Sequence, residues 1–354
     1  MTASALNSAG AVCGAHYVSR RVDIALVGAT SLIGESLIEL LEARDFPVDK
    51  LHLLDTESAA GKRIEFRGRY LAVAPAADFD FSQVRLALFV APVSLAADQV
   101  PRALEAGARV IDASTVFAED AEALLAVADV DPEGISASDA QLIVSPSPMS
   151  VQLAVALAPL QQLAGLGRVQ VATYQAVSER GRRGIKELGR QTADLLNMRG
   201  VKTSAFARQI AFNVLGRNGK TDQDGYTAEE QRVARQTKKL LACPELAITV
   251  NSAWVPVFYG HCAAVTVETR EPVELAAVRE AFERARGVEL LESEGDGDFP
   301  TPVTDAAQQD AVFIGRLRRD PAHPHGLNFW VVADNVRRGA ALNVLQIAEL
   351  LGKH

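Results

Sequence analysis

A short glycine-rich turn is the first segment whose residue types and spacing could do chemistry. Gly28-Ala-Thr-Ser-Leu-Ile-Gly34 follows an apolar, β-branched run at residues 22–27 and precedes residues 35–44, whose apolar positions recur at helical spacing. Gly28 allows a tight turn and Gly34 lets the helix lie close to the strand, while Ser31 stands near the place of the usual middle glycine. The backbone N–H groups of such a helix start can hold the pyrophosphate of a dinucleotide.

Two further kinds of side chain bear on the chemistry. Asp55 ends a second apolar run, residues 51–54, where an acid can accept hydrogen bonds from the ribose diol of NAD; a solvated loop carboxylate is the equal alternative. The cysteines Cys13, Cys243 and Cys262 are odd in number and widely spaced, so they indicate neither a disulfide framework nor a metal site. They fit a reduced, cytoplasmic setting.

A frame of alternating strands and helices must position these residues. We expect strands at residues 22–27, 51–54, 86–90, 109–111 and 142–144, and helices at 35–44, 95–106 and 119–125. This order predicts a Rossmann-type α/β nucleotide-binding domain with an open parallel sheet over residues 21–146. Residues 1–20 are rich in Ala, Ser and Gly and have no basic start before an apolar stretch, so we expect a mobile tail and no secretory signal.

The pattern changes after about residue 145. We expect helices at 151–164, 184–198, 227–241 and 273–284, and strands at 168–176, 247–257 and 262–268. This block predicts an α+β domain around a mixed sheet over residues 147–335. A last helical pattern at 338–352 is expected to return to the first domain, so that residues 336–354 pack on it.

The composition narrows the class of protein. The 354 residues are 48% hydrophobic and 23% charged, which is typical of soluble globular proteins and excludes disordered and fibrous classes. Lys and Arg number 36 against 44 Asp and Glu, and the net charge of −8 argues against a general nucleic-acid or membrane-surface binder. The sequence contains no uninterrupted run of about 18 apolar residues, the length that is needed to cross a bilayer. We therefore expect a cytoplasmic protein with no nucleic-acid or membrane partner.

Six ordered segments resemble the aspartate-semialdehyde dehydrogenase family. They run in register from about Val22 to the C-terminus: Gly28-Ala-Thr-Ser-Leu-Ile-Gly34, Thr173-Tyr-Gln-Ala-Val-Ser178, Val255-Pro-Val-Phe-Tyr-Gly-His261, Phe299-Pro-Thr-Pro302, Asn328-Phe-Trp-Val-Val-Ala-Asp-Asn335 and Gly339-Ala-Ala-Leu-Asn343. The resemblance implies a nucleotide domain, a catalytic domain that also forms a homodimer interface, and a C-terminal helix that returns to the first domain. It implies NADP or NAD as cofactor, no metal, and a place in amino-acid biosynthesis.

The family's reaction implies a set of site residues. A cysteine thiolate attacks the aldehyde, hydride passes to NADP, and phosphate releases the acyl group as aspartyl phosphate. By resemblance, Gln175 orients the substrate, His261 is the general base, and Lys239 survives from a helix motif of the substrate and phosphate site. The implied cofactor-binding residues are Gly28, Thr30, Ser31, Gly34, Asn335 and Gly339.

The nucleophile of that reaction is missing. The family's Asn-Pro-Asn-Cys segment matches Ser145-Pro-Ser-Pro148, so a proline stands at the cysteine position. Proline suits the first position of a helix, and Ser147 is expected to N-cap that helix. Ser145, Ser147 and Ser150 are alternative nucleophiles by proximity only.

The charged clamps are also changed. By resemblance, the arginine that pairs with the substrate α-carboxylate matches Trp254, a phosphate-binding arginine matches Ala118, and the acid of one helix motif matches Gln236. Cys262 follows His261 on an expected strand and should therefore point to the opposite face of the sheet as a buried thiol. It is not expected to replace the missing nucleophile.

The sequence leaves cofactor binding open. By resemblance, the arginine that contacts the 2′-phosphate of NADP matches Ser58, and the Ala-Gly-Gly-Ser loop over the cofactor reads Ala91-Pro-Val-Ser94. The retained glycines serve either a nucleotide or only turns and close packing.

Three functional hypotheses follow. The first is a catalytically inactive relative of aspartate-semialdehyde dehydrogenase, a pseudoenzyme similar to the bacterial Usg proteins, which forms a homodimer and binds a nucleotide or another protein. The alternative is an NAD(P)-dependent oxidoreductase with altered chemistry, in which His261 and Gln175 act on an aspartate-semialdehyde-like aldehyde or an acyl phosphate. The third is a subunit that pairs with an active paralogue.

Overall fold

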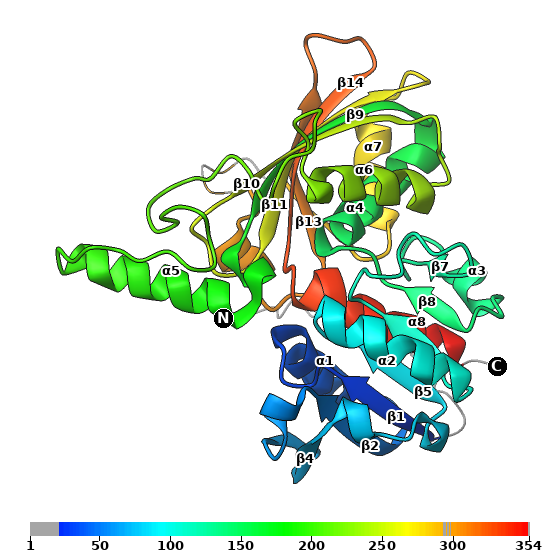
Figure 1. The fold of residues 1–354 in the computed structure, drawn as a ribbon. Helices are drawn as coiled ribbons and strands as arrows, with labels where there is room; N and C mark the ends of the chain where they lie inside the picture. The colour runs from blue at the N-terminus through cyan, green and yellow to red at the C-terminus, as the bar shows by residue number, and fades with distance from the viewer. Residues whose placement is uncertain (1–20, 293–294, 296, 298, 353–354) are drawn as a thin grey trace, which may run out of the picture.

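The computed structural model describes residues 21–292, 295, 297 and 299–352, which fold around two β-sheets (Figure 1). The sheet of the first half, blue and cyan in Figure 1, lies below the green, yellow and orange sheet of the second half, and the red C-terminal helix lies with the lower sheet. The expected tail at residues 1–20, which includes Cys13, lies outside the described residues.

The first sheet has eight strands and is parallel except for one edge hairpin. In spatial order its strands are β3 Arg63–Phe66, β4 Arg69–Pro75, β2 Val48–Asp55, β1 Val22–Val27, β5 Leu86–Phe89, β6 Arg109–Asp112, β8 Leu142–Val144 and β7 Leu124–Leu125. The strand order reverses direction between β1 and β5. The loops that follow these two strands therefore border the crevice where doubly wound sheets bind ligands.

The central strands of this sheet are buried on both faces. Residues 24–27 of β1 are 0% exposed, and every residue of β5 is buried. Helices α1 Leu32–Ala43 and α8 Leu342–Leu351 contribute to the apolar cluster on one face, and α2 Val93–Glu105 contributes to the cluster on the other. Continuous apolar runs of this kind are typical of parallel strands that are covered by helices on both sides.

The second sheet has six strands in mixed directions. In spatial order they are β10 Ala247–Trp254, β9 Leu166–Gln175, β11 His261–Thr269, β14 Gly326–Ala333, β13 Val312–Arg319 and β12 Val288–Leu291. Helices α4 Pro148–Ala164, α6 Ala228–Leu240 and α7 Leu275–Arg284 pack against it in one apolar cluster. Helix α5 Gly181–Leu196 instead projects away from the sheet, as Figure 1 shows.

Buried polar side chains attach the C-terminal segment to the rest of the chain. Asn343 Oδ1 accepts a hydrogen bond from Ala128 N, and its Nδ2 donates to Ser145 Oγ at 2.8 Å. Arg338 is 0% exposed and its Nη2 lies 2.7 Å from Asp129 Oδ2. The segment that carries Gly339 is therefore held against the start of α4.

The expected fold class, a Rossmann-type domain plus an α+β domain with a mixed sheet, is confirmed. The expected helix at 119–125 is wrong: residues 117–123 are mostly turns, and Leu124–Leu125 forms β7 beside β8. Strands β3, β4, β12, β13 and β14 were not expected as strands. The expected C-terminal helix begins with one wider π-helical turn, Arg337–Ala341, before α8. None of the described helices is long and apolar enough to cross a membrane.

Candidate functional site

The glycine turn after β1 has the backbone geometry that a dinucleotide site requires. Gly28 has φ +90°, and a Cβ there would lie 2.6 Å from Val90 O. A Cβ at Gly34 would lie 2.3 Å from Gly28 O. Both positions therefore need glycine for the close approach of the chain to itself, with or without a ligand.

Most polar side chains of this turn form hydrogen bonds with other groups of the protein. Ser31 N-caps α1, since its Oγ accepts a hydrogen bond from Gly34 N at 2.9 Å and donates to Val90 O at 3.1 Å. Asp55 Oδ2 accepts from Thr30 N at 3.0 Å and from Thr30 Oγ1 at 2.7 Å. Asp55 is only 6% exposed, so it is neither a solvated loop acid nor an open acceptor for a ribose diol.

The crevice nevertheless fits a dinucleotide. The turn lies at the reversal point of the strand order, beside the loop that leads from β5 into α2. Val93 begins α2 at the end of that loop and is 58% exposed. The turn at Gly28 and the starts of α1 and α2 would hold the pyrophosphate, and the exposed hydroxyls of Thr56 and Ser58 after β2 would face the adenosine end. When bound, NAD(P) supplies hydride transfer.

A second polar cluster gathers where β9 ends and β11 begins. Gln175 and His261 are each 1% exposed on these neighbouring strands. Gln175 Oε1 accepts from Asn218 Nδ2 at 2.8 Å. Gln175 Nε2 lies near the Glu229 carboxyl but makes no hydrogen bond of good geometry, so a buried donor remains available.

The hydrogen bonds of His261 define its tautomer. Nδ1 accepts a hydrogen bond from Ala176 N at 3.1 Å, so the ring proton of the neutral imidazole lies on Nε2. Nε2 lies 3.1 Å from Glu179 Oε2 and donates to it. In this arrangement neither ring nitrogen is free to accept a proton from a substrate.

The two carboxyl groups of this cluster differ in acidity. Burial would raise the pKa of Glu179, but the His261 hydrogen bond and nearby positive charges hold that pKa below its ordinary value. Burial, together with the charge of Glu179, raises the pKa of Glu229 to about 7, although Arg232 Nη1 lies 2.9 Å from Glu229 Oε2 and opposes the shift. An ionised carboxylate and a half-protonated carboxyl therefore share one pocket near neutral pH.

The family's nucleophile position is structurally a helix start. Pro148 is the first residue of α4, with Ser147 at the N-cap position as expected, although the Ser147 side chain makes no capping hydrogen bond. Its hydroxyl instead lies 2.9 Å from Ser150 Oγ, and Ser145 Oγ accepts from Asn343. None of these serine hydroxyls hydrogen-bonds to the His261 ring.

Two cofactor-site candidates, Asn335 and Gly339, lie in the segment that follows β14. A Cβ at Gly339 would lie 2.7 Å from the Pro148 Cβ, so the two residues are in direct contact. Asn335 Oδ1 accepts from Ser178 Oγ and Gly260 N, which joins the chain after β14 to the loops beside β9 and β11.

The remaining family positions differ in their surroundings, and among them Gln236 lies beside Pro148 with its Nε2 buried and without a hydrogen-bond partner. Trp254 is 4% exposed and the Arg180 guanidinium lies 5.3 Å from its ring centroid. Ala118 is buried, and Gln236 Oε1 accepts from Ser147 N at 3.1 Å. Lys239 is exposed on the last turn of α6 and does not line the pocket described next.

The polar cluster opens into a pocket of about 460 Å³. It is lined by the ends of β9 and β10 and the start of α6, with these residues: Gln175, Glu179, Arg180, Asn218, Gly219, Lys220, Ala228, Glu229, Arg232 and Trp254. Sequence reasoning missed Glu179, Glu229 and Arg232. Glu229 and Arg232 stand three residues apart on one helix face, which was the available signal. Nothing in the sequence pointed to Glu179 beyond its place just after β9.

No thiol of the described chain belongs to this pocket. Cys262 packs with apolar residues on the other face of the sheet, as expected, and burial raises its pKa to about 12. Cys243 is buried in the main core of the second sheet. Among the described residues no His, Cys, Asp and Glu side chains cluster as metal ligands would.

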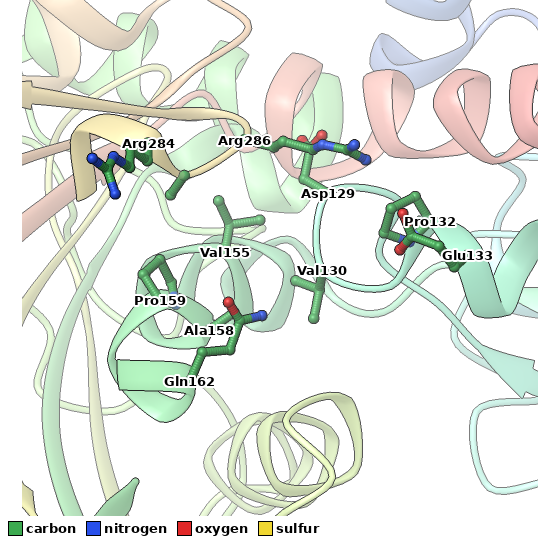
Figure 2. Close-up of a pocket in the computed structure, with 11 residues that line it drawn as sticks. Asp129, Val130, Pro132, Glu133, Val155, Ala158, Pro159, Gln162, Arg284 and Arg286 are labelled. Carbon is green, nitrogen blue, oxygen red and sulfur yellow. The ribbon is translucent and has the colours of Figure 1, made fainter. Parts of the chain in front are cut away.

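A separate cavity of about 230 Å³ lies between the loop after β7 and helix α4 (Figure 2). Asp129 and Val130 line one side, and Val155 and Gln162 line the other. Asp129 is already paired with Arg338, and none of the candidate site residues lines this cavity. The candidate site is therefore the pocket at Gln175 together with the crevice at Gly28.

Models of known protein families match both domains of the chain. Residues 23–138 match the semialdehyde dehydrogenase NAD binding domain, and residues 157–338 match the semialdehyde dehydrogenase dimerisation domain. Aspartate-semialdehyde dehydrogenase 2 of Vibrio cholerae is 43% identical over 335 residues, which cover 94% of this chain and 98% of that protein. The chain belongs to the aspartate-semialdehyde dehydrogenase family.

Other members of the aspartate-semialdehyde dehydrogenase family are similarly close. The USG-1 protein homolog of Azotobacter vinelandii is 42% identical over 337 residues, covering 95% of this chain and 99% of that protein. The crystal structure of aspartate semialdehyde dehydrogenase II of Vibrio cholerae, complexed with ASA, has a TM-score of 0.91 at 43% identity and covers 94% of this chain and 98% of that chain. The chain thus carries the family's NAD(P)-binding and dimerisation domains over nearly the full length of these relatives.

Proposed function

We propose that this chain is an NAD(P)-binding homodimer that does not catalyse the cysteine-dependent reaction of its family. The observation that carries the proposal is Pro148 at the first position of α4, in contact with Gly339. A proline side chain cannot form the acyl intermediate, and the described cysteines are buried away from the pocket.

Two further features support the loss of this reaction. His261 donates its Nε2 proton to Glu179, so a nucleophile at position 148 would find no free base there. Trp254 contributes no charge to the place where, by resemblance, an arginine pairs with the substrate carboxylate. The Arg180 guanidinium stacks on the ring of Trp254, so it occupies a different position in the pocket from the arginine that matches Trp254.

Covalent trapping tests the absence of the acyl step. The full chain is incubated with aspartate semialdehyde and NADP without phosphate, denatured, and examined by intact-mass spectrometry. We expect the unmodified mass with either NADP or NAD. An added mass of the aspartyl acyl group on any residue would overturn the proposal.

Cofactor binding and assembly are tested separately. Titration with NADP or NAD, followed by calorimetry, should show saturable binding that Gly34→Ala abolishes, because a Cβ there meets Gly28 O. Light scattering coupled to size exclusion should give twice the mass of the 37.8 kDa chain. A protein that is monomeric and binds neither dinucleotide would refute this part of the proposal.

An altered oxidoreductase is the second candidate, and the pocket supplies one observation in its favour. Glu179 and Glu229 hold different protonation states, and the unpartnered Gln175 Nε2 could bind a carbonyl oxygen. This candidate predicts turnover of an aspartate-semialdehyde-like aldehyde or acyl phosphate that is lost in His261→Ala. Equal background rates for parent and variant would exclude it.

A further inference from the structure

A second pocket, of about 740 Å³, lies next to the candidate site, and all of its charged lining residues are cations. Its charged residues are Arg180, Arg208, Arg217 and Lys220, and no Asp or Glu lines it. Among the described residues none of these four cations has a carboxylate within ion-pair distance. The chain as a whole has a net charge of −8, so this concentration of positive charge is local and opposite to the average.

The floor of the pocket is apolar and closed. Trp254 and Phe206 are 4% and 5% exposed, and their ring centroids lie 5.4 Å apart. The Arg180 guanidinium lies over the Trp254 ring, and the charge of Glu179 in the neighbouring pocket acts on it from beyond ion-pair distance. Because an apolar surface has a low dielectric constant, it strengthens the electrostatic attraction between the neighbouring cations and a bound anion.

The loop that carries Arg208 is fixed from behind by two buried side chains of α5. Glu187 Oε2 accepts hydrogen bonds from Ser204 N at 2.9 Å, Ser204 Oγ at 2.6 Å and Ala205 N at 2.5 Å. Gln191 Oε1 accepts from the backbone N of residues 210 and 211. Burial would raise the pKa of Glu187, but these donors hold that pKa below its ordinary value.

The other side of the loop is fixed by backbone pairing. Leu215 N donates to Trp254 O at 3.0 Å, and Trp254 N donates to Leu215 O at 2.9 Å. The segment between Ser204 and Leu215 is thus held at both ends, and Arg217 follows directly. Because this loop is already ordered, binding a ligand at its cations requires little further loss of conformational entropy.

We propose that this pocket is a binding site for a small polyanion with two or more phosphate or carboxylate groups. Four cations around one cavity repel each other unless an anion is present, and they match such a ligand in charge. The site is distinct from the crevice at Gly28, and it joins the Gln175 pocket through Arg180, Gly219, Lys220 and Trp254. A ligand there would adjoin whatever occupies the Gln175 pocket.

Calorimetric titration of the full-length protein with pyrophosphate and with citrate at low ionic strength tests the proposal. We expect saturable binding of at least one probe, weakened by added NaCl. Arg208→Gln and Arg217→Gln should each weaken the binding by about tenfold, since each removes a charge-assisted contact. Arg69→Gln, an equal charge change on an exposed strand of the first sheet, should leave it unchanged. The stronger probe identifies phosphate or carboxylate as the preferred group.

Three results would overturn the proposal. The first is the absence of binding by the parent protein at low ionic strength. The second is equal weakening by Arg69→Gln and Arg208→Gln, and the third is retained binding in both pocket variants; either of these would place the anion elsewhere, such as the glycine turn. Circular dichroism of the variants confirms that each is folded, which the exposed positions of Arg208 and Arg217 lead us to expect. The outcome does not depend on whether the family reaction is absent.

Discussion

The stability of the fold should depend on pH through Glu229, and Glu229→Gln should remove that dependence. The pKa of Glu229 is about 7 in the folded protein, against an ordinary value of 4.5, because burial and the charge of Glu179 disfavour the ionised form. Each pKa unit corresponds to about 1.4 kcal/mol, so ionising the folded carboxyl costs about 3 kcal/mol. The attraction of Arg232 is already included, since it acts on the same pKa.

The direction of the effect follows from the protons bound in each state. Below pH 4.5 the Glu229 carboxyl is protonated in both states and has no effect on pH dependence. Between pH 4.5 and about 7 the unfolded chain ionises while the folded chain does not, so the unfolded state binds fewer protons. The free energy of unfolding therefore falls as the pH rises through this window. Glutamine resembles the protonated carboxyl and does not ionise, so the variant does not lose this free energy of unfolding.

Urea unfolding of the parent and Glu229→Gln at pH 5 and pH 8 measures this difference. We expect the variant to be more stable than the parent by about 1 kcal/mol at pH 5 and by about 3 kcal/mol at pH 8. Glu42→Gln, at an exposed position of α1, is the matched control and should show no such trend. A gain that is the same at both pH values, or a variant less stable than the parent at pH 8, would refute the reasoning.

Two further predictions concern stability, each measured by urea unfolding. Gly28→Ala should lose about 1–3 kcal/mol more than Gly61→Ala, because both have positive φ but only Gly28 meets neighbouring backbone, with nothing within 4 Å of a Cβ at Gly61; equal losses would contradict the close approach. Asp129→Ala should cost about 3–5 kcal/mol, because it leaves Arg338 fully buried without its acid, whereas Asp45→Ala in an exposed pair should cost less than about 1 kcal/mol. Similar costs for the two pairs would show that Arg338 is not held by Asp129.

The parts of the fold that sequence could predict are those set by local pattern. The run at residues 22–27, the glycine turn and the following helix are consecutive in the chain, so their order alone indicated the nucleotide domain. Gln175 and His261 could be placed in one site only through the family resemblance. The edge strand β12 was missed because it is short and Val288 pairs with Val312 far along the chain, which leaves little local signal.

The hydrogen-bond partners inside the sites could not be predicted in the same way. Asp55 was expected to face a ribose or solvent, but Thr30, 25 residues away, binds its carboxylate in the folded chain. Glu179 lies 82 positions from His261, and only the meeting of β9 and β11 brings their side chains together. These contacts depend on side-chain directions at strand ends, which periodicity does not specify.

A steady-state assay at high protein concentration tests the central claim most directly. The purified full-length protein and His261→Ala are each given aspartate semialdehyde, phosphate and either NADP or NAD, and reduced cofactor is followed by absorbance. Because His261→Ala reports any contaminating host enzyme, we predict the same background rate for both proteins. Reduced cofactor formed by the parent above the rate of His261→Ala would contradict the account, and a group other than residue 148 would then carry the acyl chemistry.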